Sequence, residues 1–308
     1  MKDADFDAEG RDAKGQKIAG RPQVTSTLEP ALYLVGTPIG NLDDITLRAL
    51  RILKEVDVIA CEDTRQTQNL LNHFAIQART TSYHEHNEMT RSAELVKEMQ
   101  EGARVALVSD AGMPGISDPG YRLVTLAIRH HIPVVPVPGA SAFLAALVAS
   151  GMPTDAFRFS GFLPAKRGER LAVLEDIRNS AETQILYEAP HRIVDALADL
   201  VEVLGKARNV VVAREVTKLH EEFLRGSAGE VLEQLKARGS VKGEITLLIA
   251  KAEEKSAEIE IADRLSVRQR VRQIMAEEKI DQKAALKKVA RERGISKSEA
   301  YREMQREK

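Results

Sequence analysis

The 308-residue sequence is short of cysteine and of aromatic side chains. It has one cysteine, Cys61, and no tryptophan, and only 4% of its residues are aromatic. A single cysteine excludes an internal disulfide and a cysteine-cluster metal site, and it fits a reducing cytoplasm. Because aromatics are so scarce, platforms on which single-stranded bases could stack must be few.

The sequence also lacks long apolar runs. None approaches the ~20 residues that a membrane-spanning helix needs, and the N-terminal stretch has no apolar signal-peptide core. The apolar fraction of 43% and the charged fraction of 30% are those of a soluble globular protein. We therefore expect a cytoplasmic protein that neither crosses nor binds a membrane.

The sequence also has almost no net charge, since the formal value is −1 at pH 7. The charges are nevertheless unevenly distributed, because residues 264–308 hold 14 Lys and Arg against 7 Asp and Glu. A basic end on an acidic body predicts contact with a polyanion. A solvated, charged helical end is the alternative interpretation.

From residue 31 onward, short apolar runs alternate with amphipathic stretches, which predicts crossovers and a largely parallel sheet. The predicted strands cover 32–36, 57–62, 104–109 and 133–138. The helices between them are predicted over 44–56, 88–100 and 121–131. After the break at 151–153 the alternation resumes with closely spaced strands, which indicates a mixed sheet. These strands are predicted over 157–163, 183–188, 209–215, 221–226 and 244–250, with helices near 168–179, 191–204 and 227–238.

The last segment has a different, helical pattern. Three helices are predicted near 264–277, 281–293 and 296–306, with Ser296 as an N-cap. Ala290, four residues before Gly294, suits the tight crossing of a helix-turn-helix. A helical bundle that only packs on a partner subunit is the alternative. The predicted division of the chain is a disordered tail over 1–29, α/β domains over 30–141 and 142–252, and a basic helical domain over 262–308.

Three loops rich in small residues directly follow predicted strands, at 36–44, 109–120 and 137–142. Parallel sheets hold ligands at the carboxyl ends of their strands, so these loops predict a ligand cleft. The first loop is a poor match to a dinucleotide motif because Pro38 replaces its middle glycine, although Glu62 could imitate the ribose-binding acid. In the second loop, Asp118 and Pro119 are suited to start the next helix as N-cap and first helical residue.

The segment His84-Glu85-His86 would place both imidazoles on one side if the chain were extended there. No further metal-type side chains lie nearby in sequence, so we expect no metal site. A contact with substrate and a solvated surface position both remain open for these histidines.

Seven segments together resemble a known family. They are LYLVGTPIGNLDDITLRAL, EDTRQTQNLL, SYHEHNE, LVSDAGMPGISDPG, PVPGASA, YEAPHRI and AREVTKLHEEFLRG. They resemble the tetrapyrrole-methylase superfamily, and within it the ribosomal RNA small-subunit methyltransferase I family. The resemblance covers residues 30–306, and the N-terminal tail lies outside it.

The resemblance implies two α/β domains with S-adenosylmethionine bound in the cleft between them, commonly in a homodimer. It implies 2′-O-methylation of a cytidine in the decoding region of small-subunit (16S) ribosomal RNA, free or in the assembled subunit. The residues that would hold the cofactor come from the three loops and from the second domain. They are Pro38, Ile39, Asp110, Ala111, Gly112, Ile116, Ser117, Ser141, Ala142, Tyr187, Glu188, Ala213 and Thr246.

A ribose hydroxyl is a weak nucleophile, so a base that removes its proton during attack should help. By their positions after strands, the candidates for catalytic residues are Asp63, Arg65, Glu188 and Lys218. The basic members of this set, together with Arg192, are equally suited to hold RNA phosphates. Asp63 is equally suited to cap the helix that follows it.

Two other functions compete with this one. The same fold could methylate a porphyrinoid at carbon, but a small-molecule enzyme has no use for a basic appendage. A regulator that binds nucleic acid without catalysis could use the helix-turn-helix alone, but it would not require three loops clustered at strand ends. Binding of the cofactor separates this second alternative from an enzyme.

Overall fold

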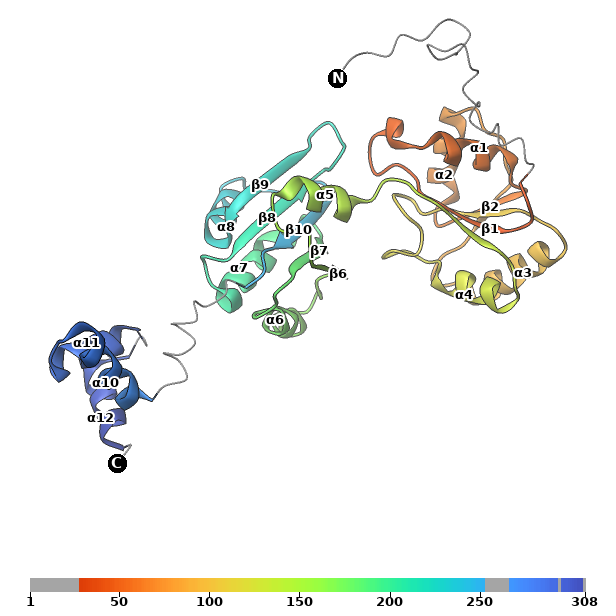
Figure 1. Ribbon diagram of the computed structural model, residues 1–308. Helices are drawn as coiled ribbons and strands as arrows, with labels where there is room; N and C mark the ends of the chain where they lie inside the picture. Colours follow the sequence, from red (N-terminus) through yellow and green to blue (C-terminus); the bar gives the residue numbers. More distant parts are fainter. Residues whose placement is uncertain (1–27, 253–265, 293–294, 307–308) are drawn as a thin grey trace, which may run out of the picture. The chain divides into compact units, whose positions relative to one another are not determined.

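The computed structural model describes residues 28–252, 266–292 and 295–306 (Figure 1). Contacts within the chain divide it into two units, residues 1–250 and 251–308. The tail predicted over 1–29 lies outside the described residues except at its last two positions, and the domain boundaries predicted from the sequence stay predictions. None of the helices described is both long and apolar enough to cross a bilayer.

The first sheet of the larger unit has five strands in the order β3-β2-β4-β1-β5, and all its pairings are parallel. Parallel strands need crossover connections, so helices cover both faces and the central strands are buried. Pro136 lies on an edge strand, where the missing N–H of proline is tolerated. The strands are β1 (Leu32–Val35), β2 (Val58–Cys61), β3 (Thr80–Ser82), β4 (Val105–Leu107) and β5 (Val134–Val137).

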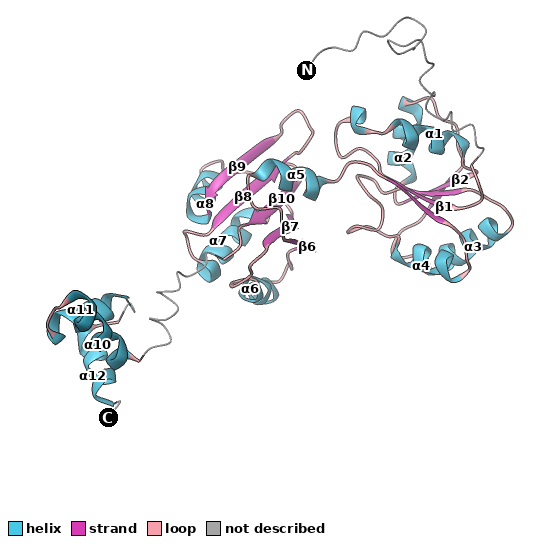
Figure 2. Cartoon of the chain, viewed as in Figure 1, coloured by secondary structure: helices cyan, strands magenta, loops and turns pink. Residues whose placement is uncertain are grey.

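Two pairs of helices cover this sheet, one pair on each face (Figure 2). Side chains alternate along a strand, so on β1 Tyr33 packs on the side of the first pair and Leu32 on the side of the second. The first pair is α1 (Leu47–Glu55) and α2 (Thr64–His73), and the second is α3 (Glu88–Gln100) and α4 (Tyr121–Arg129).

The second sheet is mixed, as the sequence predicts, with the order β6-β7-β10-β8-β9. Only β6 and β7 are parallel, and the other pairings are antiparallel. The strands are β6 (Phe157–Phe162), β7 (Thr183–Glu188), β8 (Asn209–Arg214), β9 (Glu222–Ser227) and β10 (Ile245–Ile249). One face carries α5 (Ala142–Ser150), and the other carries α6 (Arg167–Asp176), α7 (Ile193–Leu204) and α8 (Ala228–Lys236).

The sequence pattern missed β3 and the short 3-10 helix η1 (Leu42–Asp44), and it gave no range for α2 or α5, although a helix was expected after Asp63 and after the third loop. The ten residues of α2 bury only Thr67 and Leu71, so its apolar stripe is too thin to register as helical spacing. The three residues of β3 are Thr, Thr and Ser, all half-buried. By contrast, α5 is apolar all round (AFLAALVAS), so it has no periodicity to detect.

The smaller unit consists of α10 (Val267–Glu278), α11 (Gln282–Glu292) and α12 (Lys297–Arg306) around a core of its own. Ser296 caps α12 as predicted, because its hydroxyl accepts from the Glu299 N–H at 3.2 Å. The buried Ala290 accepts a backbone hydrogen bond from Ile295 at 3.0 Å, which closes the turn between α11 and α12. The predicted helical appendage is thereby confirmed.

Candidate active site

The three loops rich in small residues lie side by side at one edge of the first sheet. They follow β1, β4 and β5, and β1 pairs with both of the other two strands. Because the carboxyl ends of neighbouring parallel strands meet at one edge, the loops beginning at Gly36, Ser109 and Pro138 converge there.

Backbone contacts hold the three loops together. A Cβ atom on Gly36 would lie 2.7 Å from the Cα atom of Gly139, so the first and third loops approach as closely as only glycine allows. Thr37 and Gly112 exchange backbone hydrogen bonds of 2.9 and 3.1 Å, which joins the first loop to the second. The Thr37 hydroxyl also donates to the Ser109 carbonyl at 3.1 Å. The main chain therefore fixes this region.

A cavity of about 200 Å³ lies where these loops meet the second sheet. We call it the loop cavity. Many residues expected to hold a methyl donor line it, namely Ile39, Ala111, Gly112, Ile116, Ser117, Ser141, Ala142 and Tyr187. The rest of its lining is Met113, Asp118, Phe162, Glu244 and Ile245. Its wall therefore combines apolar side chains with two carboxyl groups.

Pro38 and Asp110, two further residues expected to bind the donor, line an adjacent cavity of about 340 Å³. Asp110 Oδ1 accepts from the Asp63 backbone N–H at 3.1 Å, and Oδ2 accepts from Gln66 Nε2 at 3.3 Å. Asp110 thus links the second loop to the start of α2.

The strands of the second sheet align the remaining expected donor-binding residues. Thr246 on β10 lies directly opposite Tyr187 on β7 and Ala213 on β8, so the three side chains share one face. Tyr187 lines the loop cavity, while Ala213 and Thr246 are buried beside it. Burial raises the pKa of the Tyr187 phenol, which therefore stays neutral at physiological pH.

Glu188 projects from the other face of the same sheet, because it follows Tyr187 and side chains alternate. Its side chain is fully buried. Glu188 Oε1 accepts from Arg192 Nε at 2.7 Å and from the Ala189 N–H at 2.7 Å, and it forms an ion pair with Arg192 Nη2. The structure thus places Glu188 in an ion pair rather than in the lining of the loop cavity.

Asp63 and Arg65 pair with each other at the start of α2. Asp63 is the N-cap of this helix, since its Oδ1 accepts from the Arg65 N–H at 2.8 Å. The hydrogen bonds from the Arg65 side chain and backbone lower the pKa of the Asp63 carboxyl to about 2. Asp63 is consequently ionised near neutral pH but only weakly basic. The Arg65 side chain is 89% exposed, so solvent or a ligand can reach its guanidinium while Asp63 holds it at 2.9 Å.

Lys218 lies against the first loop, where a Cβ on Gly40 would meet its Cγ atom at 2.3 Å. Its Nζ atom is 2.9 Å from Glu215 Oε1 and 3.3 Å from Glu244 Oε2. Burial lowers the pKa of the Lys218 amine, but the hydrogen bond with Glu215 and the charge of Glu244 outweigh it, so the net change is upward. Lys218 is therefore a fixed cation and not a base.

Asp118 is a functional candidate that the sequence interpretation missed. We predicted it as the N-cap of the next helix, and this was wrong: α4 begins at Tyr121 with Gly120 as its N-cap. Asp118 instead lines the loop cavity. Burial, followed by the charge of Glu62, raises the pKa of its carboxyl to about 6. The length of the second loop could have indicated a functional role for Asp118, because a helix start alone does not require twelve residues.

His84 and His86 do not lie on an extended segment, because the chain turns at residues 85–87. Their ring centroids are 5.9 Å apart. The backbone N–H of His84 donates to Asn87 Oδ1 at 2.9 Å. Within the described ranges, no group of three His, Cys, Asp or Glu side chains is arranged to hold a metal ion.

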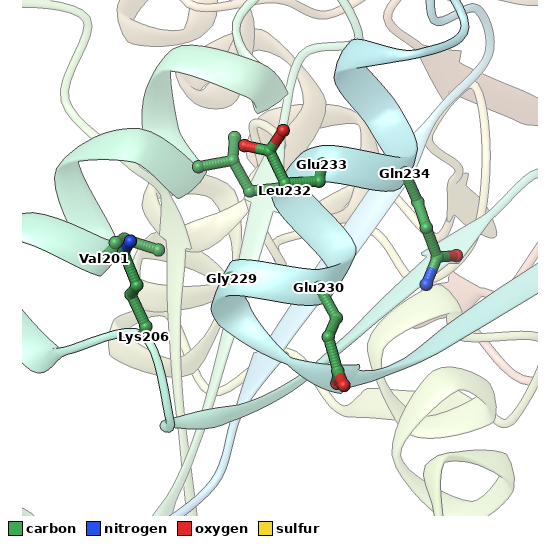
Figure 3. A pocket seen from close by; sticks show the side chains of 7 residues that line it. All are labelled: Val201, Lys206, Gly229, Glu230, Leu232, Glu233 and Gln234. Atoms are coloured by element: carbon green, nitrogen blue, oxygen red, sulfur yellow. The ribbon is translucent and has the colours of Figure 1, made fainter.

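A cavity of about 710 Å³ also lies beside α8, lined by Val201, Lys206, Gly229, Glu230, Leu232, Glu233 and Gln234 (Figure 3). Glu230 and Gln234 extend to the side of α8 away from Val201 and Lys206 (Figure 3). Glu230 is also engaged in the capping box of α8, where its Oε2 accepts from the Ser227 N–H at 3.0 Å. This cavity contains none of the predicted site residues.

A family match identifies the class of protein, and solved structures share its fold. The sequence profile of the tetrapyrrole (corrin/porphyrin) methylases matches residues 31–232. A conserved hypothetical protein from Aeropyrum pernix K1 has the same fold, with a TM-score of 0.58 and 20% identity, over 76% of this chain and 88% of that one. So does the uroporphyrin-III-C-methyltransferase of Thermus thermophilus, with a TM-score of 0.50 and 22% identity over 71% and 94%. The chain therefore shares its fold with both structures.

Curated relatives resemble the chain more closely. A protein of Halalkalibacterium halodurans is 48% identical over 271 residues, which are 88% of this chain and 93% of that protein. Proteins of Mesorhizobium japonicum and Escherichia coli O157:H7 are 50% and 49% identical, over 81% and 71% of this chain and 83% and 77% of their own. All three are named ribosomal RNA small subunit methyltransferase I. The chain belongs to this family of tetrapyrrole methylases, as its motifs predicted.

Gly139→Ala is expected to lower the free energy of unfolding by about 1–3 kcal/mol, the usual cost of overpacking, because the new Cβ meets backbone that cannot rotate away. Urea unfolding measures the change. The control is Gly168→Ala on α6, where nothing lies within 4 Å of the new atom; it should leave stability unchanged or raise it by up to ~1 kcal/mol. Equal stability of the Gly139→Ala protein and the wild type would contradict the proposed close packing of the loops.

Proposed function

We propose that this protein transfers a methyl group from S-adenosylmethionine to the ribose 2′-hydroxyl of a cytidine in the decoding region of small-subunit ribosomal RNA, in the cytoplasm. The observation that carries the proposal is the loop cavity, in a chain about half identical to proteins named as methyltransferases of this RNA. A porphyrinoid substrate remains the competing acceptor, because related folds include uroporphyrin methyltransferases.

The lining of the loop cavity fits the proposed donor, which supplies a methyl group on a positively charged sulfonium. Asp118 places a carboxyl group there, and a carboxylate attracts such a cation. Glu244 adds a second carboxyl group, which also faces Lys218 Nζ at 3.3 Å. Ile39, Met113 and Ile116 provide apolar surface for the rest of the molecule. Among the described residues that line the loop cavity, none is Lys or Arg, whose charge would oppose binding.

The protein's main task in this reaction is to position the acceptor oxygen in line with the methyl group, because the donor is already activated. The backbone ties between the loops make the cavity a rigid template for this purpose. Of the residues predicted to be catalytic, Arg65 and Lys218 are cations suited to RNA phosphates. Asp63 positions Arg65 by capping α2.

Purified protein is expected to transfer label from S-adenosylmethionine to small ribosomal subunits taken from a strain lacking this gene. Nucleoside analysis should recover the label as 2′-O-methylcytidine. Free ribosomal RNA and a tetrapyrrole precursor serve as parallel acceptors, and they distinguish the particle, the bare RNA and a small molecule as substrate. Label in the precursor alone would contradict the ribosomal assignment.

The smaller helical unit supplies a basic surface for the same RNA. Lys283, Lys287 and Arg291 are exposed on α11 and follow each other at four-residue spacing, so they form a single stripe. The opposite side of α11 is buried in the unit's own core. We find no ion pair between this stripe and other described residues. The surface thus suits a phosphate backbone better than an apolar partner.

The triple variant K283E/K287E/R291E is expected to weaken RNA binding at least tenfold at low salt. It should also reduce the slope of log affinity against log salt by ~2–3, since each lost phosphate contact removes about 0.7–0.9. Filter binding at several salt concentrations measures both. The control K166E/R178E/K236E makes the same charge change on the larger unit and should leave the slope nearly unchanged. If the two variants changed RNA affinity and its salt dependence equally, binding would depend on net charge alone, which would contradict a specific RNA surface on α11.

We also propose that the protein forms a homodimer through α5 and β6. Val148 is 76% exposed and Leu144 43% exposed on one side of α5, and the edge strand β6 exposes Phe157 and Phe162. Sedimentation equilibrium should give twice the mass of the chain, and Val148→Glu should shift the protein toward the monomer. The control Ile128→Glu changes an apolar residue on α4 that is 60% exposed, and it should leave the mass unchanged. A monomeric wild type at micromolar concentration would contradict the dimer.

A further inference from the structure

The loop cavity is not the only hollow that Asp118 lines. A cavity of about 690 Å³ lies between the second loop, the start of α3 and the outer side of α4. We call it the acceptor cavity. Ser117 and Asp118 belong to the linings of both cavities. A molecule in one cavity and a molecule in the other can therefore approach each other at these two residues.

The rim of the acceptor cavity carries two of the most exposed large apolar side chains of the protein. Tyr121 is 81% exposed and Met89 is 71% exposed, and both line this cavity. In a chain with 5 tyrosines and no tryptophan, a tyrosine presented in this way is conspicuous. An exposed aromatic ring beside a polar cavity is a platform on which a nucleobase can stack.

Asp118 has the properties that a general base needs at this junction. Asp118 is half-buried in the second loop, at the point where the two cavities share their lining. Its pKa of about 6 makes it a stronger base than an ordinary aspartate while it remains mostly ionised at neutral pH. Asp63, by comparison, is held near a pKa of about 2.

The titratable and charged groups around Asp118 come from several elements. Glu62 at the end of β2 and Asp110 in its own loop raise the pKa of Asp118, and Tyr187 faces it from β7. Arg122 on α4 is paired with Glu88 at 3.2 Å and so does not pair with Asp118. The other charged residues that line the acceptor cavity are Glu85 and Arg129.

We propose that the acceptor cavity receives the nucleoside to be methylated, with its base stacked on Tyr121 and its 2′-hydroxyl directed to Asp118, which acts as the general base. This inference rests on the proposed function. In the reaction, the hydroxyl oxygen forms a bond to the methyl carbon while the carbon–sulfur bond breaks and its electron pair stays on sulfur. The hydroxyl proton passes to the Asp118 carboxylate and then to water.

Asp118→Asn is expected to lower kcat by at least ~100-fold, with the affinity for S-adenosylhomocysteine and for RNA within about twofold of the wild type. In the wild type, kcat should rise with pH through about 6 and then level off, because the base is active when deprotonated. This rise should vanish in Asp118→Asn and persist at reduced rate in Asp118→Glu. Calorimetry with S-adenosylhomocysteine and filter binding with RNA provide readouts that do not depend on turnover.

Tyr121→Ala is expected to raise KM for RNA about fivefold or more, since stacking on an aromatic ring contributes substantially to binding of each base. Tyr121→Phe keeps the ring and should stay within twofold of the wild type. Ile128→Ala, an exposed apolar change on the same helix outside the cavity, should also stay within twofold.

Each alternative result has a definite meaning. Wild-type kcat in Asp118→Asn, or loss of S-adenosylhomocysteine binding in that variant, would overturn the role of Asp118 as base. A KM in Tyr121→Ala equal to that of Ile128→Ala would overturn the stacking site. These outcomes require an active wild type; a wild type that transfers no label to any RNA would instead overturn the proposed function.

Discussion

The close approach of the backbones at Gly36 and Gly139 is the constraint on which the site depends. A Cβ atom on either glycine would overlap the backbone of the other. Main-chain contact therefore sets the distance between the loops after β1 and β5, and no side-chain rotation can change it. The hydrogen bonds between Thr37 and Gly112 extend this fixed arrangement to the loop after β4. In-line methyl transfer is sensitive to small displacements, so a template built from main chain is suited to it.

The second sheet completes the site through alternation of side chains. Tyr187 and Glu188 are neighbours in sequence, yet one lines the loop cavity and the other forms an ion pair with Arg192 on the opposite face. The register of β10 against β7 and β8 places Thr246 directly opposite both Tyr187 and Ala213. One strand therefore serves both the site and the packing of the helices beneath the sheet.

Much of this arrangement follows from the sequence, because buried strands and loops rich in small residues leave strong patterns. The order of strands and helices, the mixed second sheet and the N-cap at Ser296 were predicted from such patterns. The short strand β3 was not, since three half-buried Thr and Ser residues carry no apolar signal. Asp118 was misinterpreted because an Asp-Pro pair before a helix is a common start signal. Only the position of Gly120 shows that the helix begins two residues later than that signal indicates.

The proposed reaction places opposite demands on the charge of the protein. A cationic donor favours the carboxyl groups around the loop cavity, such as Asp118 and Glu244, but these groups repel the phosphates of an RNA acceptor. A surplus of Lys and Arg near the cavity would attract RNA and weaken donor binding. The sequence separates the two demands, because residues 264–308 carry a net +7 and the remainder of the chain is acidic. Under the proposed function, the basic unit supplies much of the affinity for RNA, together with Arg65 and Lys218, and the acidic site needs to hold only one nucleoside.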